Sequence, residues 1–206
     1  MTPVSIATIV EGHGECEAVP ALIRRIALDV DPGFVPHVMP PHRIPVAKLR
    51  RQDELERAVK LACMKLKRKG GIIILVDCDD GCPAQEGPEL LARAKKVCPE
   101  PNLPISVILA KKEFEAWFLA AAESLAGSRG LPLTLAHPAE PEQIRDAKGW
   151  LSKQMCRGSA YTETSDQTAM TCLFDMSVAR TLSDSFNKCY RDIFSMLCKL
   201  RLAEGE

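Results

Sequence analysis

No stretch of the 206 residues stays apolar over the roughly 18 positions that a membrane-spanning helix needs. The first ten residues hold no lysine or arginine ahead of their apolar run, so they lack the charged start of a secretory signal. Net charge is also absent, because 27 basic residues balance 27 acidic ones, and overall charge gives no argument for binding nucleic acid. We expect a cytoplasmic protein with no membrane association.

Disulfide bonds are not expected either. The chain has nine cysteines, an odd number, scattered through predicted helices and strands. In a chain long enough to bury a hydrophobic core, such cysteines are typical of reduced core thiols. Cys78 and Cys82 are spaced as C-x3-C with no second pair, which argues against a zinc site.

The apolar pattern predicts alternating strands and helices over the first 126 residues. Strands are expected at 4–10, 34–39, 72–76 and 105–109, and helices at 19–26, 55–66, 88–97 and 113–125. This alternation is typical of right-handed βαβ crossovers and predicts a three-layer α/β fold with a mostly parallel central sheet. The remaining residues predict no strand, only helices near 143–155 and 184–202. We therefore expect an α/β core, residues 1–126, and a C-terminal helical extension, residues 127–206, packed on it.

Three carboxylates directly follow the two strands expected at the centre of the sheet. Glu11 follows the first strand, and Asp77 and Asp79 follow the strand at 72–76. Ligands of an open parallel sheet bind outside the carboxyl ends of its strands, so these side chains are expected to converge. Asp77 and Asp79 are two apart and point the same way if the chain leaves the strand extended. Converging carboxylates repel unless a cation neutralises them, and oxygen ligands suit Mg²⁺ or Mn²⁺.

Each acidic group also has a plain structural interpretation. Asp-Asp-Gly commonly closes a strand in a turn. Glu11 and Glu15 bracket Gly-His-Gly at a helix start, where the helix dipole favours negative charge. His13, inside that turn, can assist proton transfer, bind a second metal or simply tolerate the turn conformation. The placement of both groups after central strands favours a shared site.

Three blocks of sequence carry a resemblance to a known family. They are VEGHGECEAVPALIRRI, ILVDCDDGCPAQEGPELLARA and KKEFEAWFLAAAESL. A hydrophobic strand with EGxxE, followed later by a strand with DxD, resembles the Toprim domain of topoisomerases, bacterial primases, recombination-mediator proteins and overcoming-lysogenization-defect nucleases. The three blocks in order are most similar to a small bacterial family, domain of unknown function 4276. The resemblance covers residues 4–126 and, more loosely, YTETSDQTAMTCLFD in the tail.

The resemblance implies a three-layer Toprim (Rossmann-like) fold, and it implies roles for individual residues. Glu11 matches the Toprim glutamate that acts as acid or base, and Asp77 and Asp79 match the metal-binding aspartates. Glu15 matches an additional acidic position of the nuclease branch. The expected metal ligands are thus Glu11, Asp77 and Asp79, with Glu115 completing a second site, and Mg²⁺ or Mn²⁺ is the expected cofactor.

The junction before the expected helix at 113–125 offers further candidates. Glu113 and Glu115 are about 200° apart on a helix, so at most one is expected to face the cleft, and we favour Glu115. Lys111 or Lys112 is expected to contact a scissile phosphate as a point charge, with surface solubility as the alternative, and Lys112 is the residue we favour. The aromatic residues here have core spacing and predict packing rather than base stacking: Phe114, Trp117 and Phe118.

Two hypotheses for function follow, with a third behind them. The first is a Mg²⁺-dependent nuclease acting on DNA in preference to RNA, in which Glu11, Glu15 and Lys112 are catalytic. The resemblance implies a neighbouring AAA-type ATPase as partner and a role in phage defence. The second is a non-catalytic, nucleotide- or partner-binding subunit of such an ATPase complex. A primase-like nucleotidyl transferase is weaker, because no zinc or helicase-binding module is evident.

Two smaller features stay open between function and structure. The basic loop 43–51 can track a nucleic-acid backbone or serve solubility alone. Asp166 and Gln167 look like a family motif, and they also suit the first turn of a helix after Thr164 and Ser165.

Overall fold

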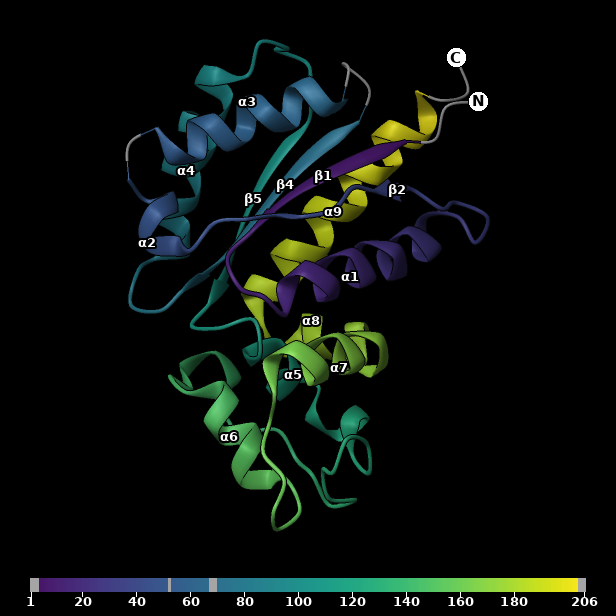
Figure 1. Ribbon diagram of the computed structural model, residues 1–206. Helices are drawn as coiled ribbons and strands as arrows, with labels where there is room; N and C mark the ends of the chain where they lie inside the picture. Colours follow the sequence, from purple (N-terminus) through teal and green to yellow (C-terminus); the bar gives the residue numbers. More distant parts are fainter. Residues whose placement is uncertain (1–3, 52, 67–69, 204–206) are drawn as a thin grey trace.

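One parallel sheet forms the centre of the molecule (Figure 1). The computed structural model describes residues 4–51, 53–66 and 70–203. Its strands are β1 (Ser5–Val10), β2 (His37–Val38), β3 (His42–Arg43), β4 (Gly71–Cys78) and β5 (Ile105–Lys111). The order is β2-β1-β4-β5, all pairs are parallel, and β3 extends the β2 edge by pairing with the end of β1. The expected α/β class with a parallel sheet is confirmed.

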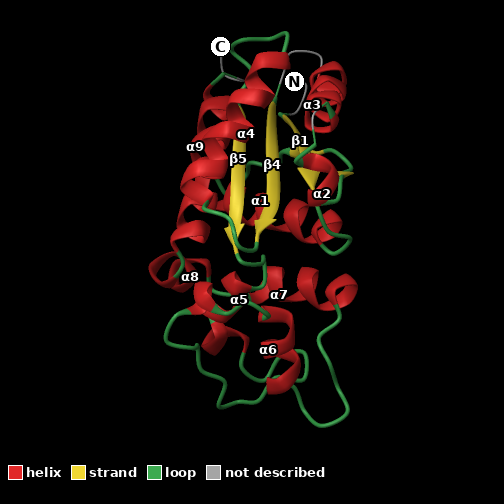
Figure 2. Ribbon diagram, turned by 90° about the vertical axis from the view of Figure 1, so that its left-hand side faces the viewer, coloured by secondary structure: helices red, strands yellow, loops and turns green. Residues whose placement is uncertain are grey.

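Helices cover both faces of this sheet (Figure 2). One face carries α1 (Glu15–Val30) and α9 (Asp184–Leu202), and the other carries α3 (Glu54–Leu66) and α4 (Pro83–Val97), with the short α2 (Val46–Leu49) before α3. Successive side chains of β4 alternate between two cores, Ile73 and Leu75 toward α1 and Ile72 and Ile74 toward α3. A strand apolar on both faces is what burial between two helical layers requires.

The remaining helices lie beyond the carboxyl ends of β4 and β5 (Figure 1). They are α5 (Ala116–Ala120), α6 (Ala147–Gln154), α7 (Thr168–Leu173) and α8 (Met176–Leu182), with 3-10 turns at Ala122–Leu125 and Pro141–Gln143 and a π-helical turn at Glu163–Gln167. The expected aromatic packing is confirmed, because Phe114, Trp117 and Phe118 are fully buried and join Phe174 and Phe186 in one cluster.

Several expected elements differ in length from the structure. The strand expected at 34–39 is only two residues, and the helix expected at 113–125 is wrong, since α5 spans Ala116–Ala120 before a 3-10 turn. Uniform burial explains that error: every residue of α5 is buried, so no polar face marks where its helical turns begin and end. As predicted, the described part of the tail contains no strand.

The helix α9 returns from the far end of the molecule to pack on the sheet beside α1 and β5 (Figure 2). Its buried residues share one hydrophobic core with α1. The division at residues 126 and 127 stays a prediction. In the part of the chain that the structure describes, no helix has the length and apolarity needed to cross a bilayer.

The cysteines are free thiols in the structure. Their positions agree with a core role only in part. Cys63, Cys78 and Cys189 are buried, whereas Cys82 and Cys156 are exposed.

Candidate active site

The pairing of β1 with β4 brings two separated acidic segments together. Val10 is in register with Leu75, so the residues after each strand leave the sheet side by side. The carboxylate Oε2 of Glu11 accepts a hydrogen bond from the backbone N–H of Asp77 at 3.3 Å. The chain segments near residues 11 and 78 therefore meet at one rim of the sheet, and the shared metal site stays a prediction.

Glu15 closes the turn between β1 and α1. Its Oε2 accepts hydrogen bonds from the backbone N–H groups of Glu11, at 2.8 Å, and Gly12, at 3.0 Å. The side chain is 2% exposed, and this burial raises its pKa to about 7, although both backbone bonds act in the opposite direction. Glu11 and Glu115 add to the rise through their negative charge. Glu15 can thus hold a proton near neutral pH.

Asp77 links the end of β4 to the chain segment that follows β5. Its Oδ1 accepts a hydrogen bond from the backbone N–H of Phe114 at 2.9 Å. Burial of the carboxyl group raises its pKa well above the ordinary value, and the nearby charges of Glu15 and Glu115 raise it further. Lys148 opposes this rise. The folded state therefore disfavours the charged form of Asp77.

Glu115 is the most enclosed carboxylate of the site, with no exposed surface. Its Oε1 accepts hydrogen bonds from the Tyr161 hydroxyl at 2.7 Å and from Gln167 Nε2 at 3.1 Å. Its Oε2 lies 3.2 Å from the Lys148 ammonium. Three partners from the C-terminal third of the chain thus converge on one glutamate just before α5.

Lys148, in α6, is a cation that faces these carboxylates. Its Nζ lies 3.2 Å from Glu115 Oε2 and 3.9 Å from Glu113 Oε2. Burial acts to lower the pKa of Lys148, but the charges of Glu115, Asp77 and Glu113 raise it above the ordinary value. Both Glu113 and Glu115 lie before α5 begins at Ala116 and contact Lys148, and the expectation that at most one of them faces the cleft stays a prediction.

We call Glu11, Glu15, Asp77, Glu115 and Lys148 the acidic cluster. Burial is the main cause of the raised pKa of Glu15 and of Asp77, and the negative charges of the neighbouring carboxylates add to it. Carboxylates gathered in this way can take up a cation, and their oxygen donors suit a hard divalent ion. Among the described residues, no three or more His, Cys, Asp or Glu side chains are already arranged to hold a metal ion.

Asp79 and Lys112 lie outside the acidic cluster. β4 ends at Cys78, so Asp79 leaves the strand direction and is exposed on the loop. The ammonium of Lys112 donates to the backbone carbonyl of Asp79 at 2.6 Å and lies 3.6 Å from Asp80 Oδ1. Lys112 itself has a left-handed φ of 67°, and its N–H donates to the Cys78 carbonyl. The metal role of Asp79 and the catalytic role of Lys112 stay predictions.

The segment 161–167 completes the site from the far side. Glu163 Oε1 accepts a hydrogen bond from Gly14 N at 3.2 Å, and Gln167 reaches Glu115. A Cβ at Gly14 would collide with Gln167 Oε1 and lie 2.7 Å from the Glu163 carbonyl, so this turn requires glycine for close approach. Asp166 accepts from the N–H of Thr162 at 2.7 Å, and it lies with Gln167 at the end of the π-helical turn Glu163–Gln167 instead of in the first turn of a helix after Thr164 and Ser165.

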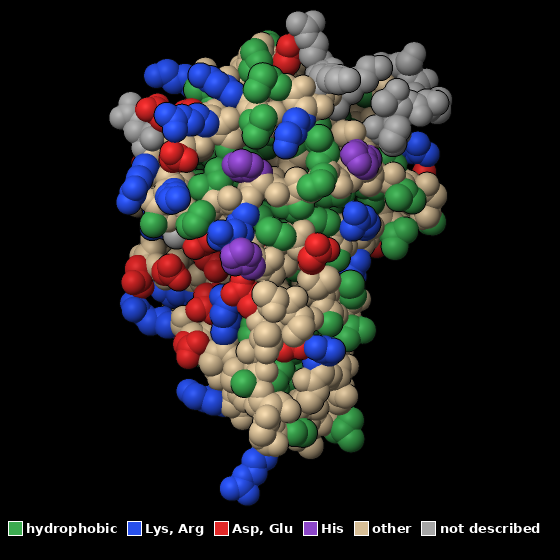
Figure 3. All heavy atoms as spheres, in the orientation of Figure 1, with side chains coloured by type: hydrophobic (Ala, Val, Ile, Leu, Met, Phe, Trp, Pro, Cys, Tyr) green, Lys and Arg blue, Asp and Glu red, His purple; other side chains and the backbone are tan. Residues whose placement is uncertain are grey.

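Sequence reasoning missed Lys148, Tyr161 and Glu163 as parts of the site. Tyr161 and Glu163 lie within the YTETSDQ block, whose polar residues were the available signal. Lys148 had no such signal, because a lysine near a helix start is usually a surface residue. Figure 3 shows acidic and basic side chains gathered on the surface at the level where the strands end.

These features define a class of protein: an α/β protein with a parallel sheet and a buried acidic cluster at the carboxyl ends of its central strands. The model of the family described as domain of unknown function 4276 matches residues 10–193. The chain belongs to this family, and the resemblance to it is confirmed. No curated protein matches the chain. No solved structure matches it either.

Removing the hydroxyl group of Tyr161 is expected to destabilise the fold. Tyr161→Phe takes one donor from a fully buried carboxylate, which should lower the free energy of unfolding by about 1–3 kcal/mol. Tyr190→Phe is a matched control, because the Tyr190 hydroxyl donates to the exposed carboxylate of Asp29. The control should lose less than about 1 kcal/mol. Urea denaturation of both variants checks this, and equal losses would contradict the burial argument.

The stability of the metal-free protein is expected to rise as pH falls from about 8 to about 5. The folded-state pKa of Glu15 is about 7, above its ordinary value of 4.5, so the folded state binds protons more tightly than the unfolded state. Glu15 contributes its full stabilisation below the unfolded pKa of 4.5, and this stabilisation is lost as pH rises through the folded pKa of about 7. The resulting change in the free energy of unfolding is about 2–3 kcal/mol. Denaturation in EDTA across this range measures it. Glu15→Gln should flatten the profile, and an unchanged profile in that variant would contradict the assignment.

Proposed function

We propose that this chain is a divalent-metal-dependent nuclease that hydrolyses phosphodiester bonds in DNA, in preference to RNA. The supporting observation is the convergence of Glu11, Glu15 and Asp77 at the carboxyl ends of two adjacent parallel strands. Ligands of parallel sheets bind at this edge. A divalent cation would stabilise the charged form of these carboxyl groups, which burial and the neighbouring carboxylates disfavour.

The donor groups present fit Mg²⁺ or Mn²⁺ in their chemistry, because all are carboxylate oxygens. Asp77 and Glu11 would hold the ion, with Asp79 joining from the loop and Glu115 serving a second position. In the present arrangement Glu115 is committed to Tyr161, Gln167 and Lys148. When bound, the ion would polarise the phosphate and lower the pKa of an attacking water.

Two side chains of the protein have properties suited to the remaining chemistry. Glu15 has a pKa of about 7, and a general acid or base works best when its pKa lies near the working pH. Glu11 adjoins it and would share the proton handling. Lys112, anchored on the Asp79 carbonyl, would place its ammonium against the negative charge that develops on the phosphate.

The Toprim-like interpretation supports the same proposal. In this chain the EGxxE glutamate follows β1, Asp77 lies at the end of β4 and Asp79 follows it, and these strands are neighbours. The family resemblance adds an AAA-type ATPase as the proposed partner and phage defence as the proposed setting.

Cleavage of supercoiled plasmid and of labelled single-stranded DNA and RNA tests the proposal. We expect nicking with Mg²⁺ or Mn²⁺ and none with EDTA, with DNA cut faster than RNA. Cleavage that persists in EDTA would overturn the metal requirement. No cleavage of any substrate, with or without the partner ATPase, would overturn the nuclease function.

One observation favours a second candidate, a non-catalytic subunit that binds a partner ATPase or a nucleotide. Lys148 already neutralises Glu115, so part of the acidic cluster serves stability without a metal. In that case Asp77→Asn would leave complex formation and the ATPase activity of the complex unchanged, and no nuclease activity would accompany assembly. Co-purification followed by a cleavage assay separates the two functions.

A further inference from the structure

The outer edge of β5 has no neighbouring strand in the described part of the chain. Ile72 N donates to the Pro104 carbonyl, so the backbone groups of residues 104 and 106 face β4. Those of Ile105, Val107 and Leu109 therefore face away from the sheet. A row of outward N–H and C=O groups is a template for another strand.

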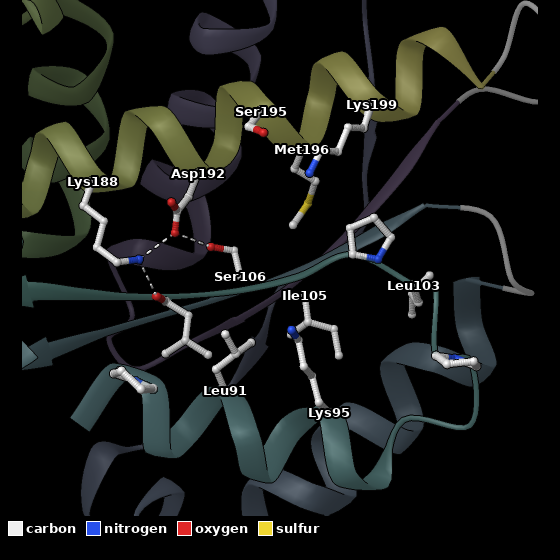
Figure 4. Close-up of a pocket in the computed structure, with 15 residues that line it drawn as sticks. Leu91, Lys95, Leu103, Ile105, Ser106, Lys188, Asp192, Ser195, Met196 and Lys199 are labelled. Atoms are coloured by element: carbon white, nitrogen blue, oxygen red, sulfur yellow. Dashed lines mark hydrogen bonds and ion pairs between the residues drawn. The ribbon is translucent and has the colours of Figure 1, made fainter. Parts of the chain in front are cut away.

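This edge lies at the bottom of a groove of about 460 Å³ between α4 and α9 (Figure 4). Leu91 of α4, Met196 of α9 and Leu103 and Ile105 next to the edge give it apolar walls. The volume falls within the range of protein ligand sites. The groove is thus suited to a single extended chain that lies between two helices.

Three lysines and one aspartate supply the charge of the groove. Lys188 Nζ pairs with Asp192 at 2.6 Å and donates to the Val107 carbonyl at 3.2 Å. Asp192 also accepts from Ser106. Lys95 and Lys199 are exposed and form no ion pair with a described residue. The groove therefore carries net positive charge that is not neutralised within the described chain.

The positive charge of the groove favours some binding partners over others. A second copy of the chain would bring the same lysines against each other across the shared edge, and like charges disfavour that pairing. A segment with acidic side chains beside its extended stretch would pair with Lys95 and Lys199 while its backbone bonds to β5. Lys188 would exchange the Val107 carbonyl for the carboxylate of the segment.

We propose that the groove beside β5 binds an extended, acid-flanked segment of a partner protein, which adds a strand to the sheet. The groove shares no residue with the acidic cluster, so this interaction does not depend on the proposed nuclease function. The outer edge of β5 would thus bind the partner protein, and the carboxyl ends of the strands would hold the proposed nuclease site.

A peptide library displayed on phage tests the proposal on the full chain. Each peptide has a core of alternating Val, Ile, Thr, Tyr and Ser, flanked by Asp and Glu in one half of the library and by Lys and Arg in the other. We expect enrichment of acid-flanked peptides. Synthetic copies should bind the double variant Lys95→Glu/Lys199→Glu about tenfold or more weakly than the wild type. Enrichment of basic flanks, no enrichment, or unchanged affinity for the variant would overturn the proposal.

Backbone methylation of the selected peptide separates strand addition from simple charge attraction. N-methyl groups on the peptide edge that faces β5 should abolish binding, whereas N-methyl groups on the opposite edge should not. Equal effects on both edges would overturn strand addition. Sedimentation of the chain alone is the remaining test, and a dimer that dissociates in the double variant would assign the groove to a second copy instead.

Discussion

Asp77→Asn is expected to lower metal-dependent cleavage by at least about a hundredfold while stabilising the metal-free protein. The loss follows because the proposed ion would lose a central ligand. The gain follows because the folded state disfavours the charged form of Asp77, whose pKa burial raises. The amide oxygen of asparagine can still accept the hydrogen bond from Phe114 N–H. We expect the free energy of unfolding in EDTA at about pH 8 to rise.

Asp80→Asn is the matched control for this variant. Asp80 lies three residues after Asp77, on the loop beyond β4. It is exposed and pairs with Arg145 at 2.7 Å. The control should retain cleavage within a few-fold and change stability by less than about 0.5 kcal/mol. If Asp77→Asn cleaves as well as this control, Asp77 is not a metal ligand. If Asp77→Asn destabilises the metal-free protein, the folded state does not disfavour the charged form of Asp77, contrary to our inference.

Lys148→Met is expected to destabilise the protein by about 3 kcal/mol, the largest effect on stability of any single change considered. The variant leaves Glu115, which has no exposed surface, without its cation. A third of the lysine side chain is exposed, which places the expected loss at the low end for a buried ion pair. Chemical denaturation in EDTA measures the loss.

Two further variants make this test specific. Lys153→Met changes an exposed lysine of the same helix and should cost less than about 0.5 kcal/mol. Combining Lys148→Met with Glu115→Gln removes both charges and should recover part of the stability lost by Lys148→Met alone. Equal behaviour of the Lys148 and Lys153 variants, or additive losses in the double variant, would show that the ion pair does not stabilise the fold.

The sequence predicted the sheet well where strands are apolar on both faces. β4 (Gly71–Cys78) and β1 (Ser5–Val10) stand out as β-branched runs because burial between two helical layers demands them. α9 (Asp184–Leu202) was found at its exact ends, since its amphipathic stripe persists over many turns. β3 (His42–Arg43) was missed because a two-residue edge strand has no periodicity to detect.

Short helices beyond the sheet escaped prediction for a related reason. α7 (Thr168–Leu173) and α8 (Met176–Leu182) each make about two turns, too few to establish a pattern. Their positions depend on tertiary packing, as the contact of Phe174 with Phe118 and Phe186 shows. Such contacts join segments far apart in the chain and leave no local signature.

The residues of the candidate site also fall into those that the sequence could predict and those that it could not. Glu11 and Asp77 were predictable because parallel strands end at one edge of a sheet, and the structure brings them within hydrogen-bond distance. Lys148 and Tyr161 were not, because they reach Glu115 only through the fold of the C-terminal segment. Asp79 was expected to point the same way as Asp77 if the chain left the strand extended. β4 ends at Cys78, and Asp79 is exposed on the loop beyond it.

Binding of Mn²⁺ to the wild-type chain and to the variants Glu11→Gln and Asp77→Asn, measured by titration calorimetry, tests the shared cation site most directly. A shared site predicts that each variant loses about tenfold or more in affinity and that the double variant loses much less than the sum of the two losses. Wild-type affinity in either variant, or independent and additive losses, would contradict a single ion held between the ends of β1 and β4.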